Sequence, residues 1–133
     1  MSNTFLNPSD LPAPVGPYSQ AVLSEGPGQW LSLAGQVGTE ADGSIPEDAA
    51  RQADLAWTYV ARALAAAGMG MEHVVKTTLY VVDRADLPAL REVRMRYLGP
   101  HRPASTLVLV SGLVDARLKF EVEALAFRPS VAG

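Results

Sequence analysis

Cysteine is absent from this sequence, and histidine occurs only twice. A chain without cysteine has no disulfide, no thiol nucleophile and no cysteine-based metal site, and it suits a reducing compartment. The two histidines, His73 and His101, lie far apart and lack a metal-binding spacing such as H-E-x-x-H. We therefore expect no bound metal, and we expect each histidine to be an ordinary exposed residue.

The sequence also lacks long apolar runs and N-terminal targeting features. No uncharged apolar stretch is long enough to cross a bilayer, and no basic start precedes an apolar segment. These absences predict a cytoplasmic protein that does not enter membranes. The glycines of Gly68–Met71 lack the following Lys-Ser/Thr of a phosphate-binding loop, so they indicate the end of a helix. Ser19 and Ser111 have no neighbouring motif that would supply a base.

Positive charge is in short supply as well. Eleven basic residues stand against fourteen acidic ones, and the formal net charge of −3 repels nucleic acid unless the basic residues cluster. Five arginines do fall in one stretch, but acidic residues are interleaved, and Arg96 would point away from Arg91 and Arg94 on a helix. We interpret this stretch as a solvated helix face and expect no nucleic-acid partner. The five arginines are Arg84, Arg91, Arg94, Arg96 and Arg102.

The composition fits one small domain over residues 1–133. Hydrophobic residues make up 48% of the chain and charged residues 19%, which is enough to build one core. The two ends, Met1–Pro12 and Pro129–Gly133, have the composition of loose termini. Between them, Ser44–Glu47 has the S-x-x-E spacing of a capping box, which predicts the start of a helix.

Hydrophobic periodicity predicts two helices and four strands. The first helix presents an apolar face from Ala49 to Leu64, and the second is capped by Asp86 and stopped by Gly99 and Pro100. The apolar residues of the second helix are Leu90, Val93, Met95, Tyr97 and Leu98. Strands are predicted at Trp30–Ala34, Val74–Val82, Ser105–Val110 and Leu118–Phe127. This order indicates an α+β fold with helices on one face of a sheet, and the uncovered face predicts an oligomer.

A stiffened loop surrounds Tyr18. The segment Ala13-Pro14-Val15-Gly16-Pro17-Tyr18-Ser19-Gln20-Ala21 contains two prolines, which fix φ, and a glycine, which permits dihedrals closed to other residues. Such a loop holds its tyrosine with little conformational freedom. It is compatible both with a structural turn that packs a tyrosine and with a binding site.

This loop resembles the Gly-Pro-Tyr-Ser-Gln signature of the RidA family, also called the YjgF family. Other segments match the same family in the expected order and together cover nearly the whole chain. They are Ala34-Gly35-Gln36-Val37-Gly38, Val75-Lys76-Thr77-Thr78-Leu79-Tyr80-Val81, Arg102-Pro103-Ala104-Ser105-Thr106 and Phe120-Glu121-Val122-Glu123-Ala124. The resemblance implies a chorismate-mutase-like fold, assembled as a homotrimer, with a small-molecule cleft between neighbouring subunits.

Two glutamates of the last predicted strand share a face, because Glu121 and Glu123 are two residues apart. By itself this pattern is typical of a solvated strand face. The resemblance implies more: Glu121 matches the carboxylate that orients or deprotonates the hydrolytic water, and Glu123 matches a glutamate of structural role. Tyr18 matches a phenol that lines the cleft, and the backbone of Ala34 and Gly35 matches a hydrogen-bonding wall.

One residue departs from the family pattern. Members that hydrolyse 2-imino acids place an arginine directly after Pro-Ala to grip the substrate carboxylate, and this chain has Ser105 there. A hydroxyl cannot replace a bidentate cation. Ser105, Thr106 and Leu107 therefore predict a cleft for a neutral or less acidic ligand. We expect Arg102, three residues earlier, to be a surface residue beside a turn.

The resemblance implies binding, and in its enzymatic form cofactor-independent hydrolysis, of a small carbonyl-, imine- or amide-like metabolite. Activity as a 2-imino acid deaminase is not expected, because the arginine is missing. A non-catalytic small-molecule-binding trimer is the alternative. An endoribonuclease, as described for some relatives, ranks third, because the sequence supplies neither a pair of acid–base histidines nor aromatic side chains beside a basic groove.

Overall fold

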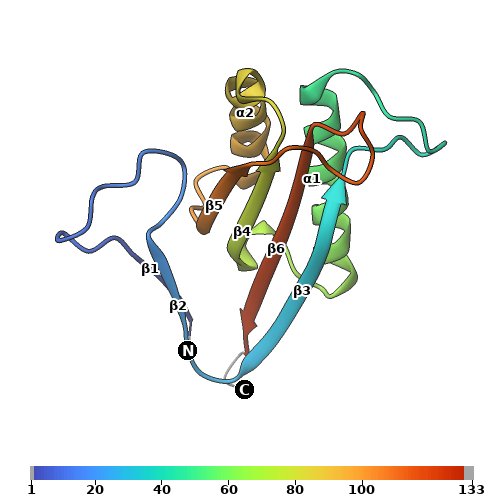
Figure 1. Ribbon diagram of the computed structural model, residues 1–133. Coiled ribbons are helices and arrows are strands. Elements are labelled where there is room, and N and C mark those ends of the chain that lie inside the picture. Colours follow the sequence, from blue (N-terminus) through green and yellow to red (C-terminus); the bar gives the residue numbers. More distant parts are fainter. Residues whose placement is uncertain (1, 131–133) are drawn as a thin grey trace.

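Four long strands and two helices form the body of the molecule, and a short hairpin lies beside it (Figure 1). The computed structural model describes residues 2–130. The elements are β1 (Asn3–Leu6), β2 (Ala21–Ser24), β3 (Gly28–Val37), α1 (Ala49–Ala66), β4 (Val74–Val81), α2 (Leu87–Leu98), β5 (Ala104–Leu109) and β6 (Phe120–Pro129). Single 3-10 turns, Met71–His73 and Arg84–Asp86, precede β4 and α2.

The main sheet is mixed and is covered by both helices on one face. Its strand order is β3-β6-β4-β5, in which β4 and β5 run parallel and the other neighbours are antiparallel. Figure 1 shows α1 and α2 side by side behind the sheet, whereas the opposite face carries no helix. The predicted α+β arrangement is therefore confirmed, and β5 forms one edge of the sheet.

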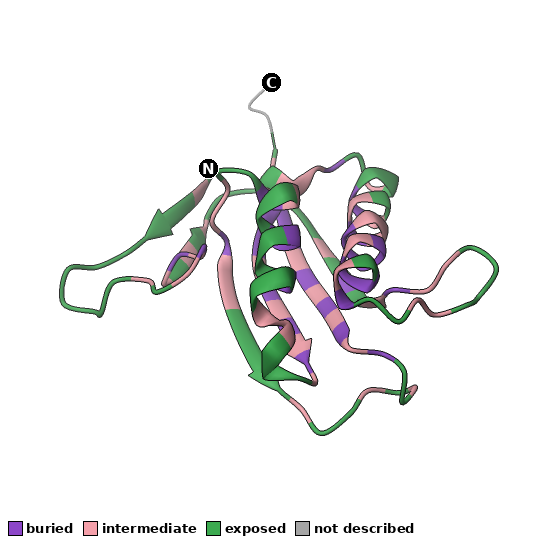
Figure 2. Cartoon of the chain, turned by 90° about the horizontal axis from the view of Figure 1, so that it is seen from above, coloured by how far each residue is buried: buried purple, intermediate pink, exposed green. Residues whose placement is uncertain are grey.

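Strand alternation decides which side chains enter the core. On β6, Phe120, Val122 and Ala124 are buried beneath the helices, and the intervening Glu121 and Glu123 lie on the open face. This alternation confirms the predicted division of β6 into two faces. In Figure 2 the buried residues concentrate where the helices meet the sheet, and most of the hairpin is exposed.

Helix α1 forms because it is rich in alanine and buries one apolar stripe. Ala53, Trp57, Val60 and Leu64 follow the predicted spacing and are fully buried. Gly68, two residues beyond the helix, adopts a φ of +70°, which favours glycine and confirms it as the terminator.

The predicted capping box at the start of α1 is wrong. Asp48 is the N-cap, and its carboxylate accepts a hydrogen bond from the Arg51 N–H. Ser44 instead donates both its N–H and its hydroxyl to the Asp42 carboxylate in a local turn. Because the Ser44 side chain is engaged in the turn, it cannot cap the helix. Asp48, which directly precedes the helix and has a short acidic side chain, is the cap instead.

Helix α2 differs from its prediction in two ways. Asp86 stands at its N-terminus but makes no capping hydrogen bond, whereas Asp83 accepts from the Ala85 N–H and caps the preceding 3-10 turn. The burial pattern also differs: Met95 is exposed, and Arg94 is buried at 8% exposure. The predicted solvated face is therefore wrong for Arg94.

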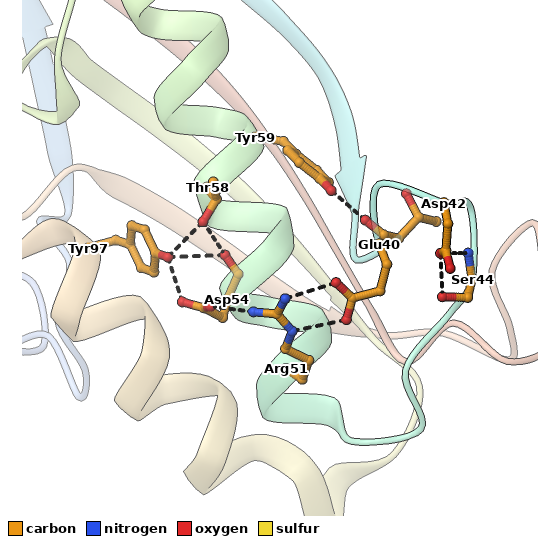
Figure 3. A network of polar contacts seen from close by, with 9 residues as sticks. Glu40, Asp42, Ser44, Arg51, Asp54, Thr58, Tyr59 and Tyr97 are labelled. Atoms are coloured by element: carbon orange, nitrogen blue, oxygen red, sulfur yellow. Dashed lines mark hydrogen bonds and ion pairs between the residues drawn. The ribbon is translucent and has the colours of Figure 1, made fainter.

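Polar contacts join the two helices at their outer edge (Figure 3). The Arg51 guanidinium forms an ion pair with Glu40 at 2.8 Å and a second with Asp54 at 3.1 Å. From α2, the Tyr97 hydroxyl donates to the Asp54 carboxylate at 2.6 Å and lies 2.9 Å from the Thr58 hydroxyl. The Tyr97 contacts hold α2 against α1, and the Arg51–Glu40 ion pair ties α1 to the loop after β3. Helix α2 carries one wall of the site described next.

The N-terminal hairpin corrects the expectation that Met1–Pro12 is loose. Asn3–Leu6 pairs antiparallel with Ala21–Ser24, and the Asn3 amide donates to the Phe127 carbonyl at 3.0 Å. β6 likewise extends to Pro129, the first residue of the other predicted loose end, whereas residues 131–133 lie outside the described chain. The hairpin pairing escaped prediction because its strands are four residues long and are separated by fourteen residues without strand character.

Candidate active site

A pocket of about 330 Å³ lies between α2, the Tyr18 loop and the edge of the sheet formed by β4 and β5. Leu79 and Val81 of β4 and Phe120 of β6 form its apolar floor, because alternate residues of these strands face the helices. Leu90 of α2 and Leu107 of β5 extend the apolar wall. The volume and the apolar lining are those of a small-molecule site.

The Tyr18 loop forms one side of this pocket. The Tyr18 N–H donates to the Gly16 carbonyl at 2.9 Å, and the Tyr18 hydroxyl accepts from the Val15 N–H at 3.4 Å. The next residue, Ser19, is 2% exposed, and its N–H donates to the Pro103 carbonyl at 3.1 Å. Tyr18 is therefore held next to the start of β5 by the backbone on both sides of it.

Ser105 and Leu107 reach the same pocket from β5. Their register partners are Thr77 and Leu79, which face the helices. The fully buried Thr77 hydroxyl donates to the Ser105 hydroxyl at 3.0 Å, so the serine side chain is oriented by a fixed neighbour. Three of the predicted site residues, Tyr18, Ser105 and Leu107, thus line one pocket.

Thr106 lies apart from these residues. It pairs with Thr78 across the β4–β5 ladder, on the open face of the sheet, and its hydroxyl accepts from the Lys76 ammonium at 2.8 Å. Ala34, predicted as part of the backbone wall, is exposed at a bulge in β3. Neither residue lines the pocket within one chain.

Glu121 also lies on the open face. Its register partner is Tyr80, and the backbone of Gly35 approaches so closely that an added β-carbon would overlap the Glu121 carboxylate. On the same face, the Tyr80 hydroxyl donates to the Glu123 carboxylate, and this bond raises the pKa of Tyr80, with smaller contributions from burial and from the charges of Glu123 and Glu121. The Tyr80 hydroxyl thus bonds to Glu123 and not to Glu121, which agrees with the structural role predicted for Glu123.

Sequence reasoning missed two arginines of the pocket. Arg91 and Arg94 both line it from α2, although Arg91 is exposed and Arg94 is buried. Burial lowers the pKa of Arg94, and repulsion by Arg91 and Arg102 adds to this effect. The helical spacing could have indicated that Arg94 faces the pocket. Leu90 follows Leu87 by three residues and Arg94 follows it by seven, so all three side chains share one face of the helix.

The remaining polar candidates have structural contacts. Arg102 donates to the carbonyls of Gly99 at 2.6 Å and His101 at 3.0 Å, within its own loop. His101 lies 2.7 Å from the Val74 carbonyl, and His73 accepts from the Gly70 N–H at 3.1 Å. Both histidines are half-buried, so the expectation that they are ordinary exposed residues is wrong. Within residues 2–130, no three His, Cys, Asp or Glu side chains gather as a metal site would require.

A model of the family described as Endoribonuclease L-PSP matches residues 9–128. The chain belongs to the RidA (YjgF) family. The match spans the Tyr18 loop, the pocket and both glutamates of β6, so all the elements that build the site belong to the family domain.

Individual relatives agree with this assignment. A RutC family protein of Pyrococcus horikoshii is 36% identical over 88% of this chain and 91% of its own length. A 2-iminobutanoate/2-iminopropanoate deaminase of Bos taurus is 32% identical over 92% of this chain and 88% of its own length. The crystal structure of the Rid family protein YyfB from Yersinia pestis superposes with a TM-score of 0.83, at 29% identity over 95% of this chain and 98% of its own.

These comparisons confirm the predicted RidA family and its fold. The roles assigned to Tyr18, Glu121, Ala34, Gly35 and Ser105 stay predictions, as does the trimer. Among the described residues, no helix combines the length and the apolar character needed to cross a membrane.

Proposed function

We propose that this RidA-family chain assembles as a homotrimer in the cytoplasm, and that its intersubunit clefts bind a small carbonyl-, imine- or amide-like metabolite and hydrolyse a C=N bond. The observation that carries the proposal is the division of the site. Tyr18 and Ser105 line a pocket on the helix side of the sheet, whereas Glu121 lies on the open face beside Gly35. Because one sheet separates the two groups within a chain, a neighbouring subunit must contribute one of them.

The chemistry assigned to these residues is acid–base hydrolysis. Water adds to the carbon of R₂C=NH while the Glu121 carboxylate accepts one of its protons and passes it to the nitrogen, which gives the adduct R₂C(OH)NH₂. Collapse of the adduct gives R₂C=O and ammonia. Tyr18 donates a hydrogen bond to the nitrogen and later to the carbonyl oxygen. Neither step consumes a cofactor, and the relatives named as imine deaminases support this reaction class.

A non-catalytic binding trimer is the second candidate, because Ser105 occupies the position at which deaminase members of the family carry arginine. We do not propose RNA cleavage. The net charge is −3, and the exposed Arg91 and Arg96 of α2 flank the exposed Glu92, so this surface carries mixed charge.

Hydrolysis is tested by generating imines in situ, from amines with an amine oxidase and from amino acids with an amino-acid oxidase, and measuring ammonia release above the spontaneous rate. Replacement of a proton-transfer group lowers rates by about 10²-fold or more, so Glu121→Gln should lower kcat by that factor without weakening ligand binding. Glu72→Gln, an exposed glutamate outside the site, is the matched control and should keep the wild-type rate. Ligand binding without any rate enhancement would favour the binding trimer, and an unchanged rate in Glu121→Gln would remove Glu121 from the mechanism.

A further inference from the structure

Arg94 is a buried arginine of α2 whose Nε atom is left unpaired by the described residues. Its side chain is 8% exposed, and its Nε atom has no hydrogen-bond partner within residues 2–130. No carboxylate of the described chain lies within ion-pair distance of its guanidinium. Burial of an unpaired cation opposes folding, and buried polar groups in native proteins almost always have partners. The Arg94 guanidinium is therefore available to a partner from outside the described chain.

The position of Arg94 indicates where that partner binds. Arg94 lines the pocket together with Tyr18 and Ser105, and Arg91 lines it from the preceding turn of α2. No acidic side chain of the described residues lines this pocket, and its walls are mainly leucine, valine and phenylalanine. Two arginines at a pocket with mainly apolar walls create a positive potential that attracts an anion.

The small side chain at position 105 is compatible with this arrangement. An arginine on β5 at this position would project into the same pocket and add a third guanidinium to those of Arg91 and Arg94. Ser105 leaves that space open, and its hydroxyl is held by Thr77. Arginine at 105 and arginine at 94 are therefore alternative ways to provide one cation in one pocket.

We propose that Arg94 binds the carboxylate of a small 2-oxo or 2-imino acid in this cleft. The arginine comes from α2, whereas the deaminase members of the family use the residue of β5 that is serine here. The inference rests on the proposed function for the location of the cleft. It replaces the neutral ligand expected from Ser105 alone with a small monocarboxylate.

The test compares two probes of similar shape and different charge, 2-oxobutanoate and 2-oxobutanamide, by titration calorimetry of the full-length protein. Wild type should bind the carboxylate roughly tenfold or more tightly than the amide, as expected for a charge-assisted hydrogen bond. Arg94→Met keeps the length of the side chain but removes its charge, so it should bind both probes equally. Arg96→Met, two residues further along α2 and exposed, should keep the wild-type preference.

Two further variants extend the test, and the first of them covers the case in which Arg94→Met fails to fold. Arg94→Lys keeps the charge but loses the bidentate geometry, so its preference should fall several-fold. Ser105→Arg combined with Arg94→Met should recover the preference for the carboxylate. Equal binding of both probes by wild type, binding of neither at millimolar concentration, or an undiminished preference in Arg94→Met or Arg94→Lys would overturn the assignment.

These outcomes are separable from those of the proposed function. A preference for the carboxylate without ammonia release would overturn hydrolysis and leave the role of Arg94 intact. Hydrolysis of imines with no preference for carboxylates would overturn the role of Arg94 alone.

Discussion

Gly35 controls the space in which Glu121 sits. Its backbone lies against the carboxylate, and any side chain at position 35 would occupy the volume of that carboxyl group. The atoms in the way belong to the end of a flexible side chain, so Glu121 can move aside at little energetic cost. At the residue scale, we therefore expect glycine to be needed here to position the proposed proton acceptor rather than to stabilise the fold.

Gly35→Ala separates these two roles. We expect the variant to keep its urea midpoint close to that of wild type, and to lose hydrolytic activity by about tenfold to a hundredfold because Glu121 is displaced from the reacting water. Gly112→Ala is the control, since nothing lies within 4 Å of the added methyl group. A large loss of stability in Gly35→Ala would instead indicate a structural glycine.

At the scale of elements, the first turn of α1 depends on one carboxylate. Asp48 accepts from the Arg51 N–H, and the preceding turn has its own hydrogen bonds between Ser44 and Asp42. These are independent local structures, since the turn lies outside the helix. A serine four residues before the cap contributes nothing to the helix terminus, although its spacing to Glu47 matches the capping motif.

Asp48→Ala should therefore lower the free energy of unfolding by about 1 kcal/mol, the usual effect of losing an N-cap side chain. Ser44→Ala removes only an exposed turn contact and should cost less than about 0.5 kcal/mol. Chemical denaturation of both variants at neutral pH measures the difference. Equal losses, or a larger loss in Ser44→Ala, would show that the turn and the helix are coupled.

For the whole molecule, β5 presents a continuous run of exposed apolar side chains at one edge of the sheet, next to the open face. Leu107, Val108 and Leu109 of β5 are each close to 40% exposed, and Glu121 lies on the same open face as Val108. Packing of subunits through the open face and the β5 edge would bury Val108 together with Leu107 and Leu109, and would bring Glu121 of one subunit toward the pocket of another. The complete site would then form only when the subunits associate.

Val108→Lys should disrupt that assembly. Light scattering of wild type should give three times the 14.1 kDa chain mass, and the variant should shift toward the single-chain mass and lose ligand binding. Met95→Lys is the matched control, because Met95 has nearly the same exposure but lies on α2, away from the open face. A wild-type protein of single-chain mass would remove the intersubunit cleft.

Much of the fold was predictable from local patterns. The apolar stripe of α1 and the alternation of β4 and β6 depend on neighbours within a few residues, so periodicity alone located these elements and the shared face of Glu121 and Glu123. The motifs from the Tyr18 loop to β6 likewise identified the family. The β1–β2 pairing could not be predicted, because it joins short segments that contain no pattern of their own.

The site likewise has features that local sequence patterns predict and features that depend on contacts between distant segments. The sequence by itself determined that Tyr18 is held in a stiff loop, that two glutamates share one strand face and that Ser105 replaces an arginine, since each is a statement about residue type and short spacing. Only the tertiary structure decided that Tyr18 and Ser105 lie on the other side of the sheet from Glu121, and that Arg94 is buried in the pocket. Burial and proximity arise from the packing of α2 on the sheet, where elements distant in sequence meet. The helical spacing places Arg94 on one face with Leu87 and Leu90, but it does not show what packs against that face.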